Sequence, residues 1–360
     1  MTHAKGDNAP IGTVVVGYGY WGPNIVRNII ESPEFELVAL CERDQARVAE
    51  FEKRWPGQRA MSKYEEALAD PDVEAVAIAT PPHTHYSLVR QALEAGKQVL
   101  VEKPLARTAG EAAELVALSE EVERVLLPGH TFLYSPSVNK VKDLIDEDAL
   151  GEIYFATSSR MNLGIYQRDG VILDLAPHDL SILLYWLGKP LVEVTANGRS
   201  VFQDDVHETA FMTLRFEGGA QANVQVSWLA PRKMRQMVVV GSQRMITYDD
   251  SVADEPVRLY DRGLEFVEPP ATFGEYQLTY RTGDMVAPQV KPAEPLGLEL
   301  ADFASAIRNG STPVSSPRLG LEVVFALQAL ERSLYANGEP VKVRSADDVR
   351  SRSRQPVAAS

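Results

Sequence analysis

A glycine-rich turn near the amino terminus constrains the fold of this chain more than any other feature. Residues 17–22 read Gly-Tyr-Gly-Tyr-Trp-Gly and follow a short apolar run from Thr13 to Val16, which predicts a buried strand. Pro23 suits the first position of a helix, and apolar residues at helical spacing continue from there. Strand, glycine turn and helix in this order favour dinucleotide binding, because such glycines let a pyrophosphate approach the start of the helix. The alternative is a tight turn that binds no ligand.

A carboxylate follows the next predicted strand. That strand covers residues 36–40, and Glu42 stands just beyond its end. A carboxylate at this place can bind the hydroxyls of an adenosine ribose, and it would repel a 2′-phosphate. Neighbouring Arg43 could stack on adenine or tolerate that phosphate. We therefore predict NAD as the cofactor, with NADP less favoured.

Short apolar strands alternate with amphipathic helices as far as about residue 128, which indicates a doubly wound parallel sheet. Ligands of such sheets bind beyond the carboxyl ends of the strands, where the segments Thr80-Pro81-Pro82, Glu102-Lys103-Pro104 and Gly129-His130-Thr131 fall. Lys103 would lie close to a nicotinamide. The predicted cofactor-binding residues are Gly17, Tyr18, Gly19, Tyr20, Trp21, Gly22, Glu42, Arg43, Thr80, Pro81, His85, Glu102 and Lys103.

Metal chemistry is not predicted. His83 and His85 have the spacing of a ligand pair, but Pro81 and Pro82 make this segment a turn, and no carboxylate partner is near in sequence. Cys41 is the single cysteine, which excludes an intramolecular disulfide or a thiolate cluster and fits a reducing compartment.

The periodicity changes after a helix predicted over residues 137–150. Longer strands are expected over 152–161, 191–201, 208–216, 220–229, 236–240 and 245–249, with a hairpin turn at Glu217-Gly218-Gly219. One helix over 178–187, closed by Gly188, interrupts them, and a last helix covers 319–335. We predict a Rossmann domain over 1–128, an α+β domain with an open-faced, mostly antiparallel sheet over 129–344, and a polar tail over 345–360.

An open sheet leaves one face to cover. Alternating apolar residues could supply that area, and a homodimer or homotetramer is expected from them. These residues are Ala220, Ala222, Val224, Val226 and Trp228.

A carboxylate and an imidazole occur together in the segment 173–179, which reads Leu-Asp-Leu-Ala-Pro-His-Asp. If Asp174 is an N-cap, Pro177 falls in the first helical turn, where its missing N–H does no harm. His178 then lies one turn beyond Asp174 on the same helix face. The two residues are either a catalytic pair or a cap and a structural histidine.

Four segments together resemble the glucose-fructose oxidoreductase / inositol dehydrogenase / rhizopine catabolism family over most of the chain. They are GYGYWG, CERD, ATPPHTHYSLVRQALEAGKQVLVEKPLA and LDLAPHDLSILLYWLG. The resemblance implies a dinucleotide-binding domain followed by an open-faced antiparallel sheet. It also implies that the lysine of Glu-Lys-Pro works at the substrate with an Asp-x-x-x-His pair, here Lys103, Asp174 and His178. Family members commonly carry an arginine shortly after the glycine at Gly129, which this chain lacks.

These residue types suit the oxidation of a secondary alcohol. Hydride leaves carbon for the nicotinamide while a base takes the hydroxyl proton, and His178 is the candidate base. Asp174 would orient the substrate or the imidazole. Lys103 would bind the reacting oxygen and stabilise developing negative charge, and Glu102 would support the cofactor or this lysine.

The predicted substrate is a sugar, and a sugar nucleotide in particular. Arg160 and Asn162 lie on a strand that leads towards Asp174, and Arg168 follows them. A second cluster comprises Arg232, Lys233 and Arg235, and guanidinium groups suit a diphosphate or carboxylate unless the cluster is only a solvated loop. The alternatives are a dehydrogenase of a free sugar or a cyclic polyol such as an inositol, and a non-catalytic regulator that binds NAD(P).

The net charge and the distribution of apolar residues limit the cellular location and the binding partners that we expect for this protein. A formal net charge of -14 argues against a nucleic-acid surface. The amino terminus lacks the apolar core of a signal peptide, and no apolar run is expected to reach membrane-spanning length. A cytoplasmic enzyme with no membrane or nucleic-acid partner is expected.

Overall fold

The computed structural model describes residues 9–164, 169–266 and 278–344. The described chain forms two compact units. The first contains residues 9–134 and 293–325, and the second contains residues 135–266, 278–292 and 326–344. Arg168 and the polar tail 345–360, both discussed above, lie outside the described residues.

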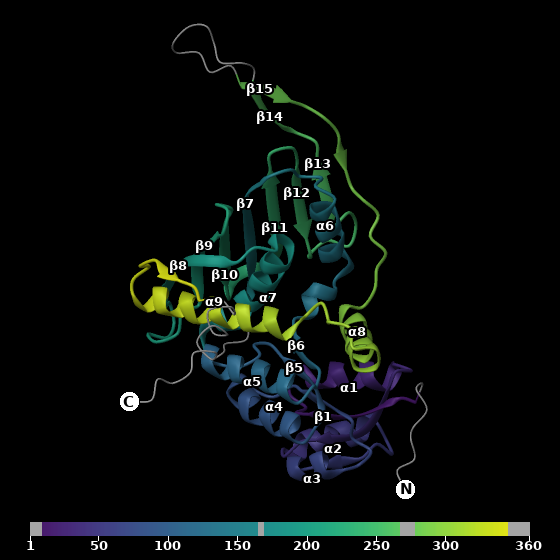
Figure 1. Ribbon diagram of the computed structural model, residues 1–360. Coiled ribbons are helices and arrows are strands. Elements are labelled where there is room, and N and C mark those ends of the chain that lie inside the picture. Colours follow the sequence, from purple (N-terminus) through teal and green to yellow (C-terminus); the bar gives the residue numbers. More distant parts are fainter. Residues whose placement is uncertain (1–8, 165–168, 267–277, 345–360) are drawn as a thin grey trace, which may run out of the picture. The chain divides into compact units, whose positions relative to one another are not determined.

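The first unit is built on a six-stranded parallel sheet with the strand order β3-β2-β1-β4-β5-β6. Figure 1 labels β1, β5 and β6 of this sheet together with helices α1 to α5. Its strands are β1 Ile11–Val16, β2 Phe35–Cys41, β3 Ala60–Met61, β4 Ala75–Ile78, β5 Gln98–Glu102 and β6 Leu126–Gly129. From β1 the chain adds β2 and β3 on one side of the sheet, and it then adds β4, β5 and β6 on the other side. Right-handed crossovers therefore place the intervening helices on both faces, as the sequence predicts for a Rossmann sheet.

The helices of this unit largely follow the strands in sequence. They are α1 Gly22–Glu31, α2 Gln45–Arg54, α3 Tyr64–Ala69, α4 His85–Glu94 and α5 Ala109–Glu121, with 3-10 turns η1 Pro82–Thr84 and η2 Thr131–Tyr134. Apolar residues of α1, such as Ile25 and Ile29, are fully buried against β1 and β2.

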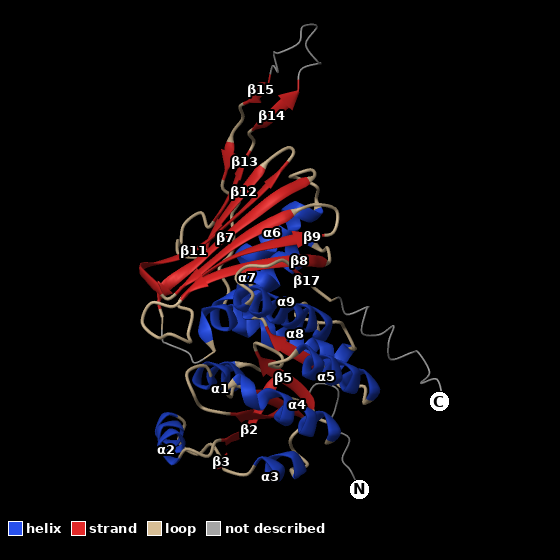
Figure 2. Ribbon diagram, turned by 90° about the vertical axis from the view of Figure 1, so that its left-hand side faces the viewer, coloured by secondary structure: helices blue, strands red, loops and turns tan. Residues whose placement is uncertain are grey.

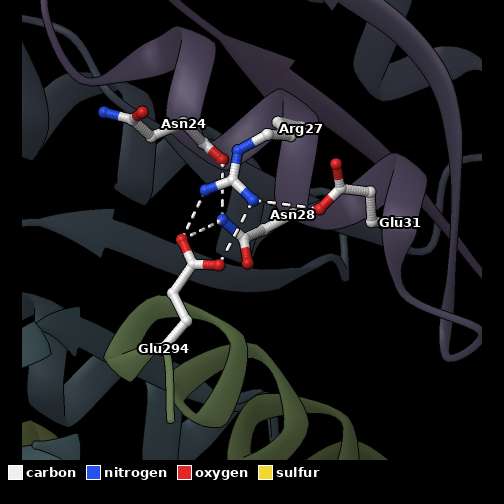
Figure 3. Close-up of polar contacts among 5 residues, drawn as sticks. All are labelled: Asn24, Arg27, Asn28, Glu31 and Glu294. Carbon is white, nitrogen blue, oxygen red and sulfur yellow. Dashed lines mark hydrogen bonds and ion pairs between the residues drawn. The ribbon is translucent and has the colours of Figure 1, made fainter. Parts of the chain in front are cut away.

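A helix from the late part of the chain, α8 Pro295–Asn309, completes the core of the first unit. Leu300 and Phe303 of α8 are buried in the same apolar cluster as α1. Figure 3 shows the polar contacts at its start, where Glu294 accepts hydrogen bonds from Arg27 and, at 3.2 Å, from Asn28 of α1. The sequence prediction contained no helix here.

The second unit contains a nine-stranded sheet in the order β16-β13-β12-β11-β7-β10-β9-β8-β17 (Figure 2). Every pairing is antiparallel except β7 with β10, so the predicted mostly antiparallel sheet is confirmed. Its strands are β7 Ile153–Leu163, β8 Leu191–Arg199, β9 Thr209–Phe216, β10 Gln221–Ser227, β11 Leu229–Gly241, β12 Met245–Asp249, β13 Val257–Tyr260, β16 Met285–Val286 and β17 Val341–Lys342. A separate hairpin pairs β14 Gly263–Phe266 with β15 Leu278–Arg281.

Helices α6 Pro136–Asp146 and α7 Gly170–Leu187 cover one face of this sheet (Figure 2). The alternating residues that were expected to cover a partner, from Ala220 to Trp228, are themselves buried within the chain, with exposed fractions of at most 6%. The expectation about these side chains is wrong, because period-two alternation indicates that a face is covered but not by what. Helix α7 packs on this side of β10.

Helix α7 begins two turns earlier than predicted, and this corrects the role of Asp174. The N-cap position belongs to Asp169, so Asp174 lies inside the helix and is not its N-cap. Pro177 is an interior residue, where its ring removes one helical hydrogen bond. By length and composition α7 could span a membrane, contrary to the expectation of no such run, but 61% of it is buried inside the fold, as in the core helix of a globular protein.

The last helix, α9 Pro317–Tyr335, begins near the predicted residue 319. In the first unit, Gly320 of α9 lies so close to Pro128 that a Cβ atom would be 2.5 Å from the proline Cγ. In the second unit, Ser333 of α9 accepts a hydrogen bond from the main chain of Ala196 in β8.

Candidate active site

The first glycine of the turn is required by its conformation and its neighbours. Gly17 has φ +95°, and a Cβ atom there would lie 2.9 Å from both the carbonyl oxygen of Ala79 and Cγ2 of Thr80. A side chain would therefore be strained and would clash. The end of β4 consequently lies directly against the glycine turn.

The other two glycines differ in what surrounds them. A Cβ atom on Gly22 would lie 2.3 Å from the carbonyl oxygen of Gly17, so close packing excludes it. A Cβ atom on Gly19 would meet only the guanidinium of Arg47, at 3.7 Å, which leaves its main chain open to approach. The N-cap residue of α1, Trp21, makes no side-chain capping hydrogen bond. An uncapped helix start beside an open glycine fits an anionic pyrophosphate.

Side chains of the turn contribute unequally. Tyr18 is buried with its ring edge-on to Phe51 at 5.5 Å between centroids, so the turn offers a ligand its main chain rather than this side chain. Tyr20 is 85% exposed, and Arg43 is also exposed. Their predicted cofactor contacts remain predictions.

Glu42 ties the end of β2 to the glycine turn. Its carboxylate accepts the main-chain N–H groups of Tyr18 and Arg43 at 2.8 Å and that of Asp44 at 3.0 Å. Burial raises the pKa of Glu42, but these hydrogen bonds outweigh burial and hold the pKa below its usual value. A carboxylate that stays ionised at this place suits a ribose hydroxyl donor, which is the role predicted for it.

The ends of β4 and β5 are joined through a histidine. His85 is fully buried, its Nδ1 lies 2.8 Å from the carbonyl oxygen of Pro104, and its Nε2 lies 2.8 Å from that of Thr80. Lys103, partly buried, stands immediately before Pro104. Pro81 is exposed at the start of the turn that follows Thr80.

Glu102, the last residue of β5, is in an unusual environment for a carboxyl group. Its Oε1 is shielded from solvent and has no hydrogen-bond partner among the residues that the structure describes, and Gly129 of β6 lies directly opposite Glu102 in the sheet. A Cβ atom on Gly129 would come within 3.3 Å of the carboxyl carbon. Desolvation raises the pKa of Glu102 to about 7, and the charge of Lys103 opposes this only in part.

Two further buried titratable residues lie beside β6 and were not identified from the sequence as site residues. His130 is 1% exposed, and desolvation lowers its pKa to about 3. Glu299 of α8 is fully buried and accepts a hydrogen bond of 2.8 Å from the hydroxyl of Thr131, and burial raises its pKa well above the usual range. Glu299 sits among apolar residues in Leu296 to Leu300, and that isolated acid was the available signal.

In the second unit, Asp174 and His178 lie one turn apart on α7, as predicted from their spacing. The indole N–H of Trp228 donates to Oδ2 of Asp174 across 2.9 Å. The start of α7 is also held, because the N–H of Val171 donates to the carbonyl oxygen of His207 at 3.0 Å. The carboxylate therefore projects from an anchored helix.

Arg160 is held by the next acid of the same helix. Its Nε lies 2.9 Å from Oδ2 of Asp179, whose other oxygen accepts from Ser158 at 2.8 Å, and both charged side chains are at most 4% exposed. This buried ion pair connects β7 to α7. Asn162 follows two residues along the same side of β7 and is partly buried. Substrate contacts by Arg160 and Asn162 stay predictions.

The basic cluster after Trp228 lies on an irregularity of the sheet. Leu229 of β11 pairs with Leu163 of β7, and Met234 pairs with Met161. Four residues of β11 therefore lie opposite a single residue of β7, and they form a bulge. Arg232 and Lys233 stand on this bulge and are exposed. Arg235 is instead paired with Asp250 at 3.0 Å.

Two matches to described families cover most of the chain. Residues 11–130 match the family described as "Oxidoreductase family, NAD-binding Rossmann fold". Residues 138–247 match the family described as "GFO/IDH/MocA C-terminal domain". Together with the two sheets and the glycine turn, they define a nicotinamide-dependent oxidoreductase. The chain belongs to the GFO/IDH/MocA family, as the sequence resemblance predicted.

Three similar proteins illustrate the range of the family. The NAD-dependent scyllo-inositol 2-dehydrogenase of Bacillus subtilis (strain 168) is 26% identical over 91% of this chain and 95% of its own. The dTDP-3,4-didehydro-2,6-dideoxy-α-D-glucose 3-reductase of Saccharopolyspora spinosa is 30% identical over 53% of this chain and 60% of its own. The crystal structure of GenD2 from gentamicin A biosynthesis, in complex with NAD, has 26% identity and a TM-score of 0.78 over 96% of this chain and 99% of that one.

Proposed function

We propose that the protein is an NAD-dependent dehydrogenase that transfers hydride between a secondary alcohol of a sugar and the nicotinamide. The observation that carries the proposal is the anchored Asp174–His178 pair of α7, in a chain whose other unit carries Lys103 just after β5 and a glycine turn suited to NAD after β1. The bound cofactor supplies the hydride acceptor at its nicotinamide ring.

The residues of the chain supply the proton chemistry and the charge. His178, as a neutral imidazole, takes the hydroxyl proton of the sugar. Asp174, fixed by Trp228, orients the substrate or biases the imidazole. Lys103 binds the reacting oxygen and stabilises the negative charge that develops on it. Each of these groups sits at the end of a strand or inside a helix, which limits its movement.

A sugar nucleotide is the proposed substrate. The exposed Arg232 and Lys233 stand on the β11 bulge, four and five residues beyond the tryptophan that holds Asp174, and they suit the diphosphate of such a substrate. The relative from Saccharopolyspora spinosa is named for a nucleotide-linked sugar. The second candidate is a cyclic polyol, favoured by the inositol dehydrogenase that matches over nearly its full length.

The proposal also covers setting and assembly. A cytoplasmic enzyme is consistent with the single buried cysteine, Cys41, and with a supply of NAD. A homodimer or homotetramer remains our proposal for its assembly. Its interface must use side chains other than the buried alternating residues of β10.

The experiment is NADH formation or consumption with a panel of UDP- and dTDP-sugars, free sugars and inositols. We expect turnover with a nucleotide sugar, and Arg232→Ala and Lys233→Ala should each raise its KM about tenfold. Lys189→Ala, which removes an exposed lysine after α7, is the matched control and should leave KM unchanged. Turnover of inositols alone would select the second candidate. NAD binding without turnover on any member of the panel would contradict the proposed activity.

A further inference from the structure

Two buried polar atoms of the first unit lie close together without a hydrogen bond of normal geometry between them. One is the indole nitrogen Nε1 of Trp21, in the glycine turn, and the other is Oε1 of Glu102, at the end of β5. Neither atom has a hydrogen-bond partner among the residues that the structure describes. The indole N–H is nevertheless near enough to the carboxyl group to lower the pKa of Glu102. An indole nitrogen only donates and a carboxylate only accepts, so the two groups are complementary.

The two side chains come from strands on either side of β4. In the sheet, β4 lies between β1, which leads into the turn that contains Trp21, and β5, which ends at Glu102. Trp21 also starts α1, because its carbonyl oxygen accepts the N–H of Asn24 at 2.9 Å. Lys103 directly follows Glu102. A hydrogen bond between the two side chains therefore connects the start of α1 to the strand end that carries Lys103.

Packing keeps both partners in place. Gly129 lies opposite Glu102 in β6, and a Cβ atom on this glycine would be 3.1 Å from Cα and 3.3 Å from the carboxyl carbon of Glu102. The missing side chain thus leaves the space that the carboxyl group occupies. Trp21 packs against the apolar core of the first unit. Both side chains are consequently confined at close range.

We propose that Trp21 is a positioning residue whose indole N–H binds the ionised carboxylate of Glu102 and thereby holds Lys103 in a fixed relation to the glycine turn. The inference rests on the proposed function, in which Lys103 binds the reacting oxygen. Trp21 acts on the lysine through Glu102. Because an ionised carboxylate is a stronger acceptor than a neutral acid, the contact tightens when Glu102 loses its proton.

The groups around the carboxyl decide when it ionises. Desolvation raises the pKa of Glu102 to about 7, and Lys103 and the indole of Trp21 oppose that rise. His130, just after β6, carries no charge at neutral pH, because burial lowers its pKa to about 3. Glu299 of α8 interacts electrostatically with Glu102, and this repulsion adds to burial in raising the pKa of Glu299 well above the usual value. Glu102 is therefore the member of this group that changes charge near neutral pH.

The contact can be tested by NMR on the full-length protein labelled with 15N-tryptophan. The Trp21 signal is the indole resonance that is lost in Trp21→Phe. We expect it to move downfield as pH rises through a single ionisation near neutrality, and this movement should disappear in Glu102→Gln. The indole of Trp186, which donates to the carbonyl oxygen of Val138, is the internal reference and should stay fixed. A Trp21 signal that does not titrate near neutrality, or that still titrates in Glu102→Gln, would overturn the proposal.

The positioning role is tested by kinetics on the sugar that the substrate panel identifies. Trp21→Phe keeps an aromatic ring and removes the donor. It should lower kcat about tenfold, with the KM for the sugar changed much less, because a hydrogen bond to a charged group is lost. Trp55→Phe is the matched control. Its indole nitrogen is also buried and unpaired within the described residues, but it lies near the hydroxyl of Tyr18, and its loss should leave kcat unchanged.

A double-mutant cycle connects the effect to the lysine. In a Lys103→Met background, Trp21→Phe should lower kcat no further. An equal loss in both backgrounds, or an equal loss in Trp55→Phe, would refute the positioning role. Near wild-type turnover of Lys103→Met would refute the proposed function instead, whereas the NMR titration tests the contact of Trp21 with Glu102 independently of turnover.

Discussion

Trp228 donates its indole N–H to Oδ2 of Asp174 across 2.9 Å, from the link between β10 and β11 to the second turn of α7. The indole is 2% exposed and is packed so tightly that a Cβ atom on Gly164 would lie 2.4 Å from its ring. The tryptophan therefore cannot change its rotamer without displacing Gly164. Asp174 is therefore oriented by a rigid donor.

Trp228→Phe should keep the packing and remove the donor. We expect the KM for the sugar to rise and turnover to fall, together about tenfold in kcat/KM, because a buried hydrogen bond to a charged group is lost. Trp186→Phe is the matched control, since its indole also donates at 2.9 Å, to the carbonyl oxygen of Val138. That variant should lose stability and keep its kinetic constants. Equal kinetic effects of both substitutions would argue against an orienting role of Trp228.

Lys103→Met should lower turnover by roughly a hundredfold or more, because it removes charge stabilisation of the reacting oxygen. NAD affinity, measured by calorimetry, should fall far less. His178→Asn should cost a comparable factor.

The pH dependence of turnover tests independently whether His178 is the general base. A histidine base must be neutral, and histidines ordinarily lose their proton near pH ~6.5. Wild-type turnover should therefore rise with pH through a single ionisation near neutrality, and this rise should vanish in the residual activity of His178→Asn. If either His178→Asn or Lys103→Met keeps near wild-type turnover, the proton leaves by another route and the assignment is wrong.

Glu42→Ser should shift the cofactor preference towards NADP. The substitution removes a carboxylate that stays ionised and would repel a 2′-phosphate, next to exposed Arg43, which could accept one. The ratio of kcat/KM with NADP to that with NAD measures the shift. Some stability should also be lost, because three main-chain N–H groups lose their acceptor. Tighter binding of NADP than NAD by the unaltered protein would contradict the assignment.

The features that the sequence predicted well are local. The glycine turn requires a positive φ at Gly17 and close packing at Gly22, and both requirements are visible as residue types. The i, i+4 spacing of Asp174 and His178 also holds whatever the start of the helix. Such patterns depend on the backbone of a few neighbouring residues, so the sequence alone is sufficient to find them.

The features that it missed depend on distant parts of the chain. The contact of Arg27 with Glu294 spans 267 residues, so nothing near α8 in sequence indicates that this helix docks on α1. The start of α7 was misplaced because Pro177 favours a first helical turn locally, while burial of the helix against the sheet tolerates it in the interior. The desolvated position of the Glu102 carboxyl group likewise depends on Gly129, which only the folded structure brings opposite it.

Glu102 supplies the last prediction, a pH dependence of stability. Its pKa in the folded chain, about 7, exceeds the value of roughly 4.3 for an unfolded chain, so the folded state binds the proton more tightly. The contribution of Glu102 to the free energy of unfolding should therefore be greatest below pH ~4, fall as pH rises, and level off above pH ~7. The fall attributable to this residue is at most about 4 kcal/mol. Urea unfolding at a series of pH values measures this fall, and Glu102→Gln, which mimics the neutral acid, should remove the part of the slope that Glu102 contributes.

Glu36→Gln, which replaces an exposed carboxylate on β2, is the control and should leave the slope as it is. A Glu102→Gln profile that declines as steeply as the wild type would mean that another buried acid, such as Glu299, carries the proton.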